Sequence, residues 1–411
     1  MKLLAWPRRW AWINRTVLGI VLATFFSDVS HEMATAVLPF YLAGIGLGAF
    51  ALGLIEGTAD FLVSISKLAG GYVGHHVQHK KPWAALGYLV TTLGTFGIAL
   101  VGSLAAVLSL RCAAWVGRGF RSPLRDFLLA DAVEPTHYGR AYGLERAGDM
   151  LGAVMGPFLA ALLLWGGWEF RSIILWTALP GLAAASLFFF LTRERPVSSH
   201  SDSDPPKLST VAALVRFPRM FWLFLIGVTV FGLGDFSRTF IVFLAAEALG
   251  ETKTALPQAL SVAVVLYMVH NLVSAMSAYP VGWLGDRRSK MPILVGGYGL
   301  GAFTNLLLAL HGQALAILIP AIVLSGFYIS VEETLEKAVA ADLLPRELRS
   351  LGFGILACCN AVGDMASSFY VGYLLQAGYP AAAFGIAASV GGLGFVWMLA
   401  LLRRASRVSG S

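Results

Sequence analysis

The chain has 411 residues, of which 57% are hydrophobic and 13% charged, and its mean hydropathy is +0.73. A soluble domain of this length does not carry so much apolar surface, so the composition indicates a membrane protein. The net charge of +7 is explained by basic loops beside membrane segments, and we predict no nucleic-acid partner.

Twelve apolar segments run along the chain, and each is long enough to cross a bilayer, for which about 20 helical residues are needed. The third, sixth, ninth and twelfth contain no Asp, Glu, Lys or Arg and cover about residues 83–104, 172–191, 292–310 and 380–402. A charge at bilayer depth costs roughly 2.5–3.5 kcal/mol and normally faces protein or water. We therefore predict an all-α membrane protein with four helices facing lipid and eight surrounding something polar.

Lys and Arg are concentrated in alternate loops, as Arg9, Lys81, Arg195, Arg288 and Arg403 illustrate. The positive-inside rule then places both termini in the cytoplasm of a multi-pass protein of the cytoplasmic (inner) membrane. We expect the first segment to be a retained helix rather than a cleaved signal peptide. We also expect a monomer surrounded by the lipid bilayer.

The first predicted helix carries Asp28, His31 and Glu32, whose i, i+3 and i+4 spacing places them on one helical face near mid-membrane. A carboxylate in such a place can bind and release a proton near neutral pH. Glu32 is the first candidate for proton coupling and Asp28 the second. His31 and Asp60 of the next helix are further candidates. The alternative for Asp28 is a structural bond to a helix end or a neighbouring Arg.

The second helix contributes Glu56 and Asp60, again at i and i+4, and Glu56 is a candidate for the substrate cavity. The loop that follows contains three histidines: His75, His76 and His79. The favoured interpretation is a solvated loop that tolerates histidine. A loop that senses pH or binds metal stays open as an alternative, and we assign no metal or other cofactor.

The fourth helix carries four arginines. Arg111 lies deep, and Arg118, Arg121 and Arg125 follow along one face at i, i+3 and i+7. A guanidinium offers planar, bidentate binding to a carboxylate or phosphate. These arginines therefore either form part of a gate or hold an anionic substrate, and Arg111 and Arg118 are assigned to the cavity.

Residues 192–218 are rich in Ser, Asp and Pro and lack apolar periodicity, which predicts a solvated linker between bundles 1–191 and 219–411. The two bundles resemble each other at a spacing of about 211 residues. Gly71-Tyr-Val-Gly-His75-His76 aligns with Gly282-Trp-Leu-Gly-Asp286-Arg287, and Gly87-Tyr88 aligns with Gly297-Tyr298. Four such matches in chain order indicate an internal duplication, for which a midplane site between the repeats is expected.

The repeat places Tyr267 and Asn271 of the eighth helix, beside His270, at the depth of the acids in the second helix. We predict that they line the substrate site. The alternative is an interhelical hydrogen bond, worth about 0.6 kcal/mol on average. The remaining cavity candidates are Asp235 and Arg238 of the seventh helix and Asp364, the single acid of the eleventh.

The repeat also maps Arg121 and Arg125 onto Glu332 and Glu336 of the tenth helix, next to Glu333. Opposite charges at related positions can meet across the cytoplasmic mouth of a cavity. We therefore predict a gate whose ion pairs close one side and break when that side opens.

The loop from Gly282 through Asp286 and Arg287 to Lys290 resembles the G-x-x-x-D-R-x-x-R/K signature of the major facilitator superfamily. The Asp-x-x-x-Pro…Arg loops after the fourth and tenth helices are also similar to that family. The resemblance implies two pseudo-symmetric six-helix bundles and alternating access. It further implies that the signature Asp caps and pairs with a neighbouring helix in the outward-facing state. His75 and His76 replace the signature pair in the first half, so this lock is expected to be weaker there or to depend on histidine protonation, near pH 6.5.

We predict a secondary active transporter of a small organic solute, with protons as the coupling ion, and not an enzyme. Acids beside Phe25, Phe26, Tyr41 and Trp115 slightly favour efflux of amphipathic compounds. The alternative is an importer of an organic anion or siderophore-like metabolite, which the arginines would suit. A membrane sensor or subunit with a transporter fold is the alternative from another class. No GxxxxGK[ST] phosphate loop supports ATP as a direct energy source.

Overall fold

The computed structural model describes residues 10, 12–46, 49–195, 210–237, 240, 244, 262–311 and 314–409, and the regular structure within these ranges is entirely helical. Long apolar runs form helices because a helix satisfies all its backbone hydrogen bonds within one segment. The first half of the fold, named here for its position in the chain, comprises α1 (Arg15–Gly44), α2 (Ala49–His76), α3 (Lys81–Gly97), α4 (Leu104–Ala132), α5 (Tyr138–Trp165), α6 (Phe170–Trp176) and α7 (Ala178–Leu191). Short 3-10 turns, η2 (Ile98–Leu100) and η3 (Pro135–His137), extend α3 and precede α5.

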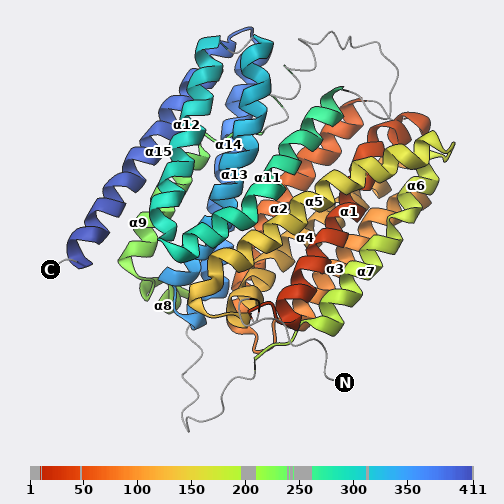
Figure 1. The fold of residues 1–411 in the computed structure, drawn as a ribbon. Helices are drawn as coiled ribbons and strands as arrows, with labels where there is room; N and C mark the ends of the chain where they lie inside the picture. The colour runs from red at the N-terminus through yellow and green to blue at the C-terminus, as the bar shows by residue number, and fades with distance from the viewer. Residues whose placement is uncertain are drawn as a thin grey trace.

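A six-residue helix, α8 (Thr210–Val215), precedes the second half (Figure 1). The second half comprises α9 (Arg219–Gly232), α11 (Val262–Arg287), α12 (Lys290–His311), α13 (Leu315–Leu343), α14 (Arg349–Gln376) and α15 (Pro380–Ser409). The turn η4 (Arg346–Leu348) precedes α14 as η3 precedes α5. Eight helices of the described ranges are long and apolar enough to cross a membrane.

The four predicted charge-free segments correspond to α3, to α6 with α7, to α12 and to α15. They expose large apolar side chains, such as Leu179 and Phe190 on α7, Leu310 on α12 and Leu393 on α15. None of these helices contributes to the polar cavity described below. Exposed apolar surface on this scale is what a lipid-facing helix presents, and the prediction from missing charges is confirmed in that respect.

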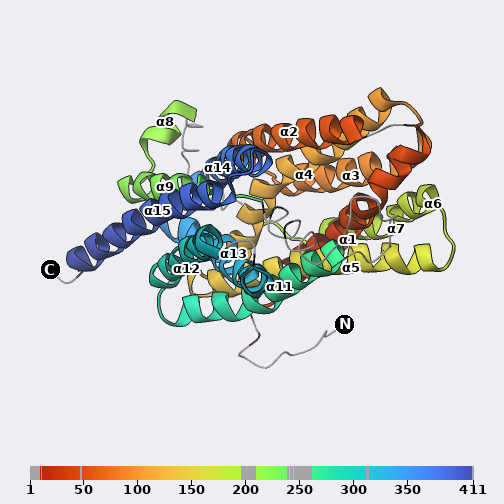
Figure 2. The same cartoon turned by 90° about the horizontal axis from the view of Figure 1, so that it is seen from above.

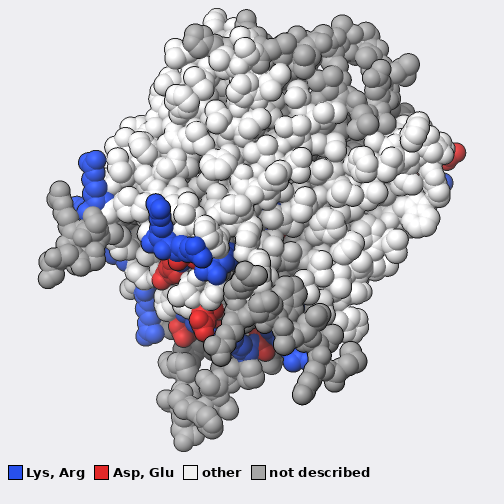
Figure 3. All heavy atoms as spheres, in the orientation of Figure 1, with Lys and Arg blue, Asp and Glu red and all other residues white. Residues whose placement is uncertain are grey.

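The Lys and Arg side chains visible in Figure 3 gather toward one end of the molecule. We call this the basic end; it contains the loops between α2 and α3, α4 and α5, α11 and α12, and α13 and α14. The two halves meet along two seams, α5 against α11 and α2 against α14 (Figure 2). Glycines allow the backbones to touch at both. Gly282 lies against the backbone of Gly139, and Gly71 against that of Gly354, with no room for a Cβ atom.

The buried apolar residues also divide by end. One cluster joins the two halves and includes Tyr142 of α5, Val281 of α11 and Phe353 of α14. A second cluster draws on the first half alone, around Val37 and Ile174. A third draws on the second half alone. Among the described residues, the halves thus share a core at the basic end and have separate cores toward the opposite end.

Candidate functional site

A cavity of about 290 Å³ lies between the two halves. Its walls come from α2, α4 and α5 on one side and from α13, α14 and Asp235 on the other. Thirteen of the lining residues are charged. The cationic ones are Lys67, Arg118, Arg121, Arg125, Arg146 and Lys337, and the anionic ones are Asp126, Asp149, Asp235, Glu332, Glu333, Glu336 and Asp364.

These charges are segregated. The first half contributes five cations and two anions to the lining, whereas the second half contributes one cation and five anions. The halves therefore face each other with opposite net charge. That arrangement attracts the halves to each other and polarises the space between them.

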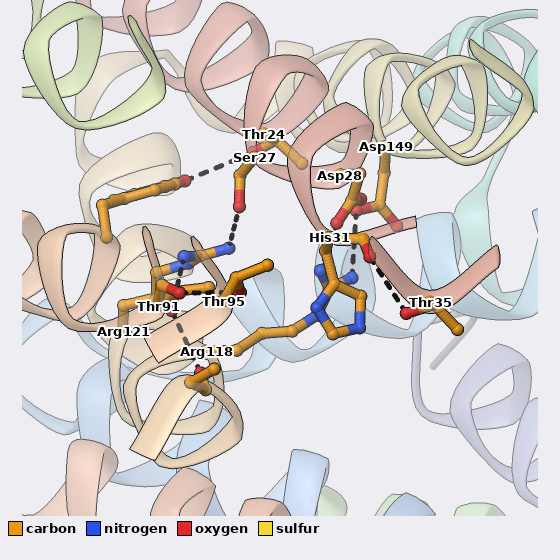
Figure 4. A network of polar contacts seen from close by, with 12 residues as sticks. Thr24, Ser27, Asp28, His31, Thr35, Thr91, Thr95, Arg118, Arg121 and Asp149 are labelled. Atoms are coloured by element: carbon orange, nitrogen blue, oxygen red, sulfur yellow. Dashed lines mark hydrogen bonds and ion pairs between the residues drawn. The ribbon is translucent and has the colours of Figure 1, made fainter. Parts of the chain in front are cut away.

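One chain of ionic contacts crosses the cavity from α1 to α13. Arg118 of α4 forms an ion pair with Asp28 of α1, and its other terminal nitrogen lies 3.8 Å from Asp149 of α5 (Figure 4). Arg146 Nη1 lies 2.7 Å from both Asp149 Oδ2 and Glu333 Oε2 of α13. The chain contains three carboxylates and two guanidiniums, so it holds one carboxylate in excess.

A second ionic group lies closer to the basic end. Arg125 Nη1 lies 2.9 Å from Glu145, and Arg125 Nη2 lies 3.0 Å from Asp126. Lys337 of α13 reaches the same two acids at 3.8 Å. Two cations and two carboxylates form a balanced ring, which is the arrangement that offsets the cost of burying charge.

Arg121 has polar but uncharged partners. It donates to Ser27 Oγ at 2.7 Å and to Thr91 Oγ1 at 3.1 Å (Figure 4). Its guanidinium carbon lies 3.8 Å from the centre of the Tyr88 ring, a cation–π distance. Its contacts to the described residues include no carboxylate.

Glu336 is held by neutral groups as well. Tyr298 donates a short hydrogen bond to Glu336 Oε1, and Asn360 Nδ2 donates to Oε2 at 2.7 Å. Tyr298 in turn stacks on Phe231, with ring centres 3.8 Å apart. Within the described part of the chain, no cation lies within ion-pairing distance of Glu336.

These contacts differ from the predicted gate. Arg121 pairs with hydroxyls rather than Glu332, and Arg125 pairs with Glu145 and Asp126 rather than Glu336. At the cavity, the ionic contacts between the halves are instead Arg146–Glu333 and Lys337 with its two acids. The physical reason is proximity, since α4 and α5 supply acids of their own beside Arg125, and α3 supplies the Tyr88 ring on which Arg121 packs.

Four further candidates, on α1, α4 and α11, do not line the cavity. His31 is buried and packs edge-on against Trp115, with ring centres 4.7 Å apart. Arg111 is fully buried and donates to Thr35 Oγ1 at 3.1 Å. Glu32 lies close enough to Tyr267 of the other half for the two side chains to interact electrostatically. Arg111, Tyr267, Glu32 and His31 do not contribute to the lining of the cavity described here.

The remaining candidates are distributed as follows. Asp235 Oδ1 accepts from Tyr328 at 3.1 Å, and both Asp235 and Asp364 line the cavity. His270 Nδ1 lies 3.1 Å from Asn271 Oδ1 of the same helix, and this buried pair lies outside the cavity lining, so this contact is not the interhelical hydrogen bond of the alternative. Arg238 lies outside the described residues, as do the side chains of Glu56 and Asp60.

The signature loop of the second half forms the interaction that the family resemblance implies. Asp286 accepts from the backbone N–H groups of Gly139 and Arg140 at 2.8 and 2.9 Å, and Arg140 Nε lies 3.2 Å from its Oδ2. A carboxylate at the start of α5 is favoured by the free N–H groups there. Arg287 stacks over Trp283.

The first half has no such carboxylate. His75 Nδ1 lies 3.3 Å from the carbonyl oxygen of Glu347, and His76 Nδ1 lies 2.9 Å from that of Tyr72. His79 lies 3.8 Å from Glu194. Burial lowers the pKa of Lys80 in this loop, and Glu194 opposes that effect. A further link between the halves joins Asp131 to Arg346, with Nε and Oδ1 2.5 Å apart.

Several residues of the site were not among the residues predicted to form it. They are Lys67, Asp126, Glu145, Arg146, Asp149, Lys337 and Asn360. Arg146 pairs with Asp149 within α5 and also reaches Glu333 in the other half. The usable signal was the repeat of Tyr88 and Tyr298, because each tyrosine contacts a buried charge: Arg121 packs on the Tyr88 ring, and Glu336 accepts from the Tyr298 hydroxyl.

The family model described as "Major Facilitator Superfamily" matches residues 20–331 and 233–411. An uncharacterized MFS-type transporter of Methanocaldococcus jannaschii is 26% identical over 364 residues, which cover 88% of this chain and 89% of that protein. An uncharacterized protein of Mycobacterium tuberculosis is 24% identical over 373 residues, with 90% and 88% covered.

Solved structures share the fold. The E. coli fucose:proton symporter has a TM-score of 0.73 at 14% identity, covering 94% of this chain and 98% of that one. A bacterial homologue of the iron transporter ferroportin, in an outward-facing state, has a TM-score of 0.73 at 13% identity, with 94% and 99% covered. The human organic anion transporter MFSD10 has a TM-score of 0.72 at 16% identity, with 93% and 99% covered. The chain belongs to the major facilitator superfamily and is a multi-pass membrane transporter rather than an enzyme.

Proposed function

We propose that this secondary transporter couples the movement of a small, ionised organic solute to protons, and that it acts as a monomer. The observation that supports this proposal is the ionic chain from Asp28 to Glu333, which crosses the cavity and contains one more carboxylate than guanidinium groups. A single protonation neutralises that excess, and the chain joins both halves. Proton binding is thereby linked to the contact between them.

We further propose that the basic end lies in the cytoplasm of the inner membrane, because Lys and Arg gather there as the positive-inside rule requires. The contacts described between the halves at this end include Arg140–Asp286, Arg346–Asp131 and the two glycine seams. With that orientation the structure is closed toward the cytoplasm, in an outward-facing arrangement. Residues 192–218 then act as the cytoplasmic linker between bundles 1–191 and 219–411.

The cavity lining favours an ionised solute over the amphipathic compound expected from aromatic residues. Trp115 lines the cavity, but Phe25, Phe26 and Tyr41 do not contribute to this lining. The Tyr41 hydroxyl instead donates to the carbonyls of Ile98 and Val101 at 3.1 and 2.7 Å. With thirteen charged lining residues, the cavity offers more charged than apolar side chains to a solute. Import and export are both compatible with this geometry.

Asp28 and Asp149 are better placed for proton coupling than Glu32. They share the guanidinium of Arg118, and Asp149 lines the cavity from which a proton can arrive. Two carboxylates close to one cation compete for it, so one of them gains a proton at lower cost than an isolated ion pair would.

Solute-driven proton movement tests the proposal. The protein is reconstituted in liposomes loaded with a pH-sensitive dye, and carboxylates, amines, zwitterions and neutral sugars are added in turn. We expect at least one ionised solute to move protons, and Asp28→Asn and Asp149→Asn to abolish the signal. Glu169→Gln, at an exposed carboxylate outside the cavity, should leave it intact. Solute flux without proton movement would contradict proton coupling, and no flux of any solute would favour the sensor alternative.

A further inference from the structure

We propose that the cavity selects a small zwitterion, with its anionic group at the wall of α2 and α4 beside Lys67 and its cationic group at the wall of α13 and α14 beside Glu336. The inference rests on the proposed function and names its substrate class. It comes from the distribution of charge between the walls and from which charges lack a partner of opposite sign.

The segregation of charge disfavours simple ions. A mono-anion attracted to the first-half wall must also face the five carboxylates of the second half. A mono-cation faces the five cations of the first half. Like charges brought together in an interface repel each other and disfavour binding. A zwitterion oriented along the field between the walls satisfies both.

Two cations of the first-half wall, Lys67 and Arg121, have no carboxylate partner among the described residues. Arg121 is held by two hydroxyls and the Tyr88 ring, which leaves Lys67 as the available cation. Its ammonium makes no hydrogen bond or ion pair with any described residue, and it lies in the field of Asp364 and Glu333 across the cavity. By contrast, Arg118, Arg125 and Arg146 are each committed to carboxylates. A bound carboxylate or phosphonate would give Lys67 the partner that it lacks.

Glu336 is the corresponding anion of the second-half wall. Its buried carboxylate is held only by Tyr298 and Asn360, which are neutral, so the described residues supply it with hydrogen bonds but no countercharge. Asn360 Oδ1 is itself buried without a hydrogen-bond partner. A substrate ammonium beside Asn360 could donate to this oxygen and neutralise Glu336.

The internal duplication explains how the two walls came to be opposite. Tyr88 and Tyr298 are repeat-related, and each contacts one buried charge on the neighbouring helix. In the first half that charge is the cation Arg121, and in the second half it is the anion Glu336. The two contacts differ in kind, because Arg121 packs on the ring face of Tyr88 whereas Glu336 accepts from the Tyr298 hydroxyl, but the charge on the helix beside each tyrosine is of opposite sign in the two halves.

The cavity volume sets the size of the ligand. At about 290 Å³ it lies near the lower end of ligand pockets, about 300 Å³. We therefore expect a small metabolite whose charged groups are a few bonds apart.

Two matched triplets of solutes test the inference through thermal stabilisation of the purified protein. The first is leucine, 4-methylpentanoate and 3-methylbutylamine, and the second is 6-aminohexanoate, hexanoate and hexylamine. We expect at least one zwitterion to bind about tenfold more tightly than its acid and its amine, equivalent to about 1.4 kcal/mol.

Single substitutions in each wall test which charged group of the zwitterion that wall binds. Lys67→Gln should reduce the preference for the zwitterion over the amine, because the carboxylate loses its partner. Glu336→Gln should reduce the preference for the zwitterion over the acid, and Glu336→Asp, which retains the charge, should preserve it if the Gln variant does not fold. Arg404→Gln and Glu169→Gln remove exposed charges outside the cavity and should leave both preferences unchanged.

Equal binding of an acid or an amine and its zwitterion would overturn the inference. So would the absence of stabilisation by either zwitterion in a folded sample. Proton movement driven by a mono-ion would overturn the substrate class while supporting the proposed function. A zwitterion that binds with the expected selectivity but moves no protons would support the substrate class and count against proton coupling.

Discussion

At the scale of single residues, Arg118 is the point where charges from three helices meet. Its guanidinium contacts Asp28 of α1 and Asp149 of α5 from a position on α4 that lines the cavity. Asp149 is also held by Arg146, which binds Glu333 of the other half. A change in protonation at Asp28 or Asp149 therefore alters the competition for Arg118 and Arg146, and through Arg146 the contact between the halves.

A double-mutant cycle measures this contact between the halves. Arg146→Gln and Glu333→Gln should each lower the melting temperature, and the double variant should lose less than the sum because the second change removes no further ion pair. We expect a coupling energy above about 0.5 kcal/mol, the usual threshold for contacting residues. The loss of the Arg146–Asp149 pair cancels in the cycle, since both Arg146 variants share it. Strict additivity would show that the pair contributes nothing to closure.

At the scale of elements, the repeat-related loops between α2 and α3 and between α11 and α12 differ in strength. Asp286 accepts two backbone hydrogen bonds from the start of α5. His75 has the equivalent place, next to the turn before α14, and contacts a carbonyl instead. The absence of a carboxylate leaves the start of α14 without the favourable charge that α5 has. We therefore expect that separating the α5–α11 seam requires more free energy than separating the α2–α14 seam.

His75→Asp should strengthen the weaker seam. The new carboxylate would face the N–H groups at the start of α14, where Gly74 already lies against Ser350. A helix cap is worth about 1 kcal/mol, so we expect a higher melting temperature and slower solute flux, because the closed basic end is favoured. His75→Asn serves as the uncharged control and should give a smaller effect. An unchanged melting temperature together with faster flux would contradict the role assigned to this loop.

The positions of charge in the sequence predicted which helices expose apolar surface and which line a polar space, and the internal repeat could be identified from the sequence as well. It did not predict the ionic partners of the arginines. Arg125 meets Glu145 and Asp126, and Arg121 meets Ser27, Thr91 and the Tyr88 ring. These contacts depend on how α4 is rotated against α1, α3 and α5, which repeat spacing does not determine. The same spacing placed Arg121 opposite Glu332, although the contacts of Arg121 are with Ser27, Thr91 and Tyr88.

At the scale of the whole molecule, the two halves share a core and several ion pairs at the basic end and have separate cores toward the other end. The cavity lies between them with oppositely charged walls. Rocking of one half against the other, the motion expected for this architecture, would exchange these contacts and expose the cavity to the other side. The basic end must then open and close in turn during each transport cycle.

Reversible cross-linking tests this requirement. Asp131→Cys and Arg346→Cys, introduced after replacing Cys112, Cys358 and Cys359, place two thiols where the native side chains form an ion pair. A short, reducible thiol cross-linker should stop solute flux, and reduction should restore it. Each single Cys variant treated in the same way is the control. Full flux with the cross-link in place would show that the basic end need not open.

The most direct test of the central claim compares two kinds of flux in the Asp28→Asn variant, in proteoliposomes with an identified substrate. A pH gradient drives net flux through a proton-coupled carrier, whereas exchange of labelled for unlabelled substrate requires no net proton movement. We predict that the wild-type protein shows both, and that Asp28→Asn retains exchange while losing flux driven by the gradient. Gradient-driven flux that persists undiminished in both Asp28→Asn and Asp149→Asn would contradict the assignment of the proton site to the carboxylates around Arg118.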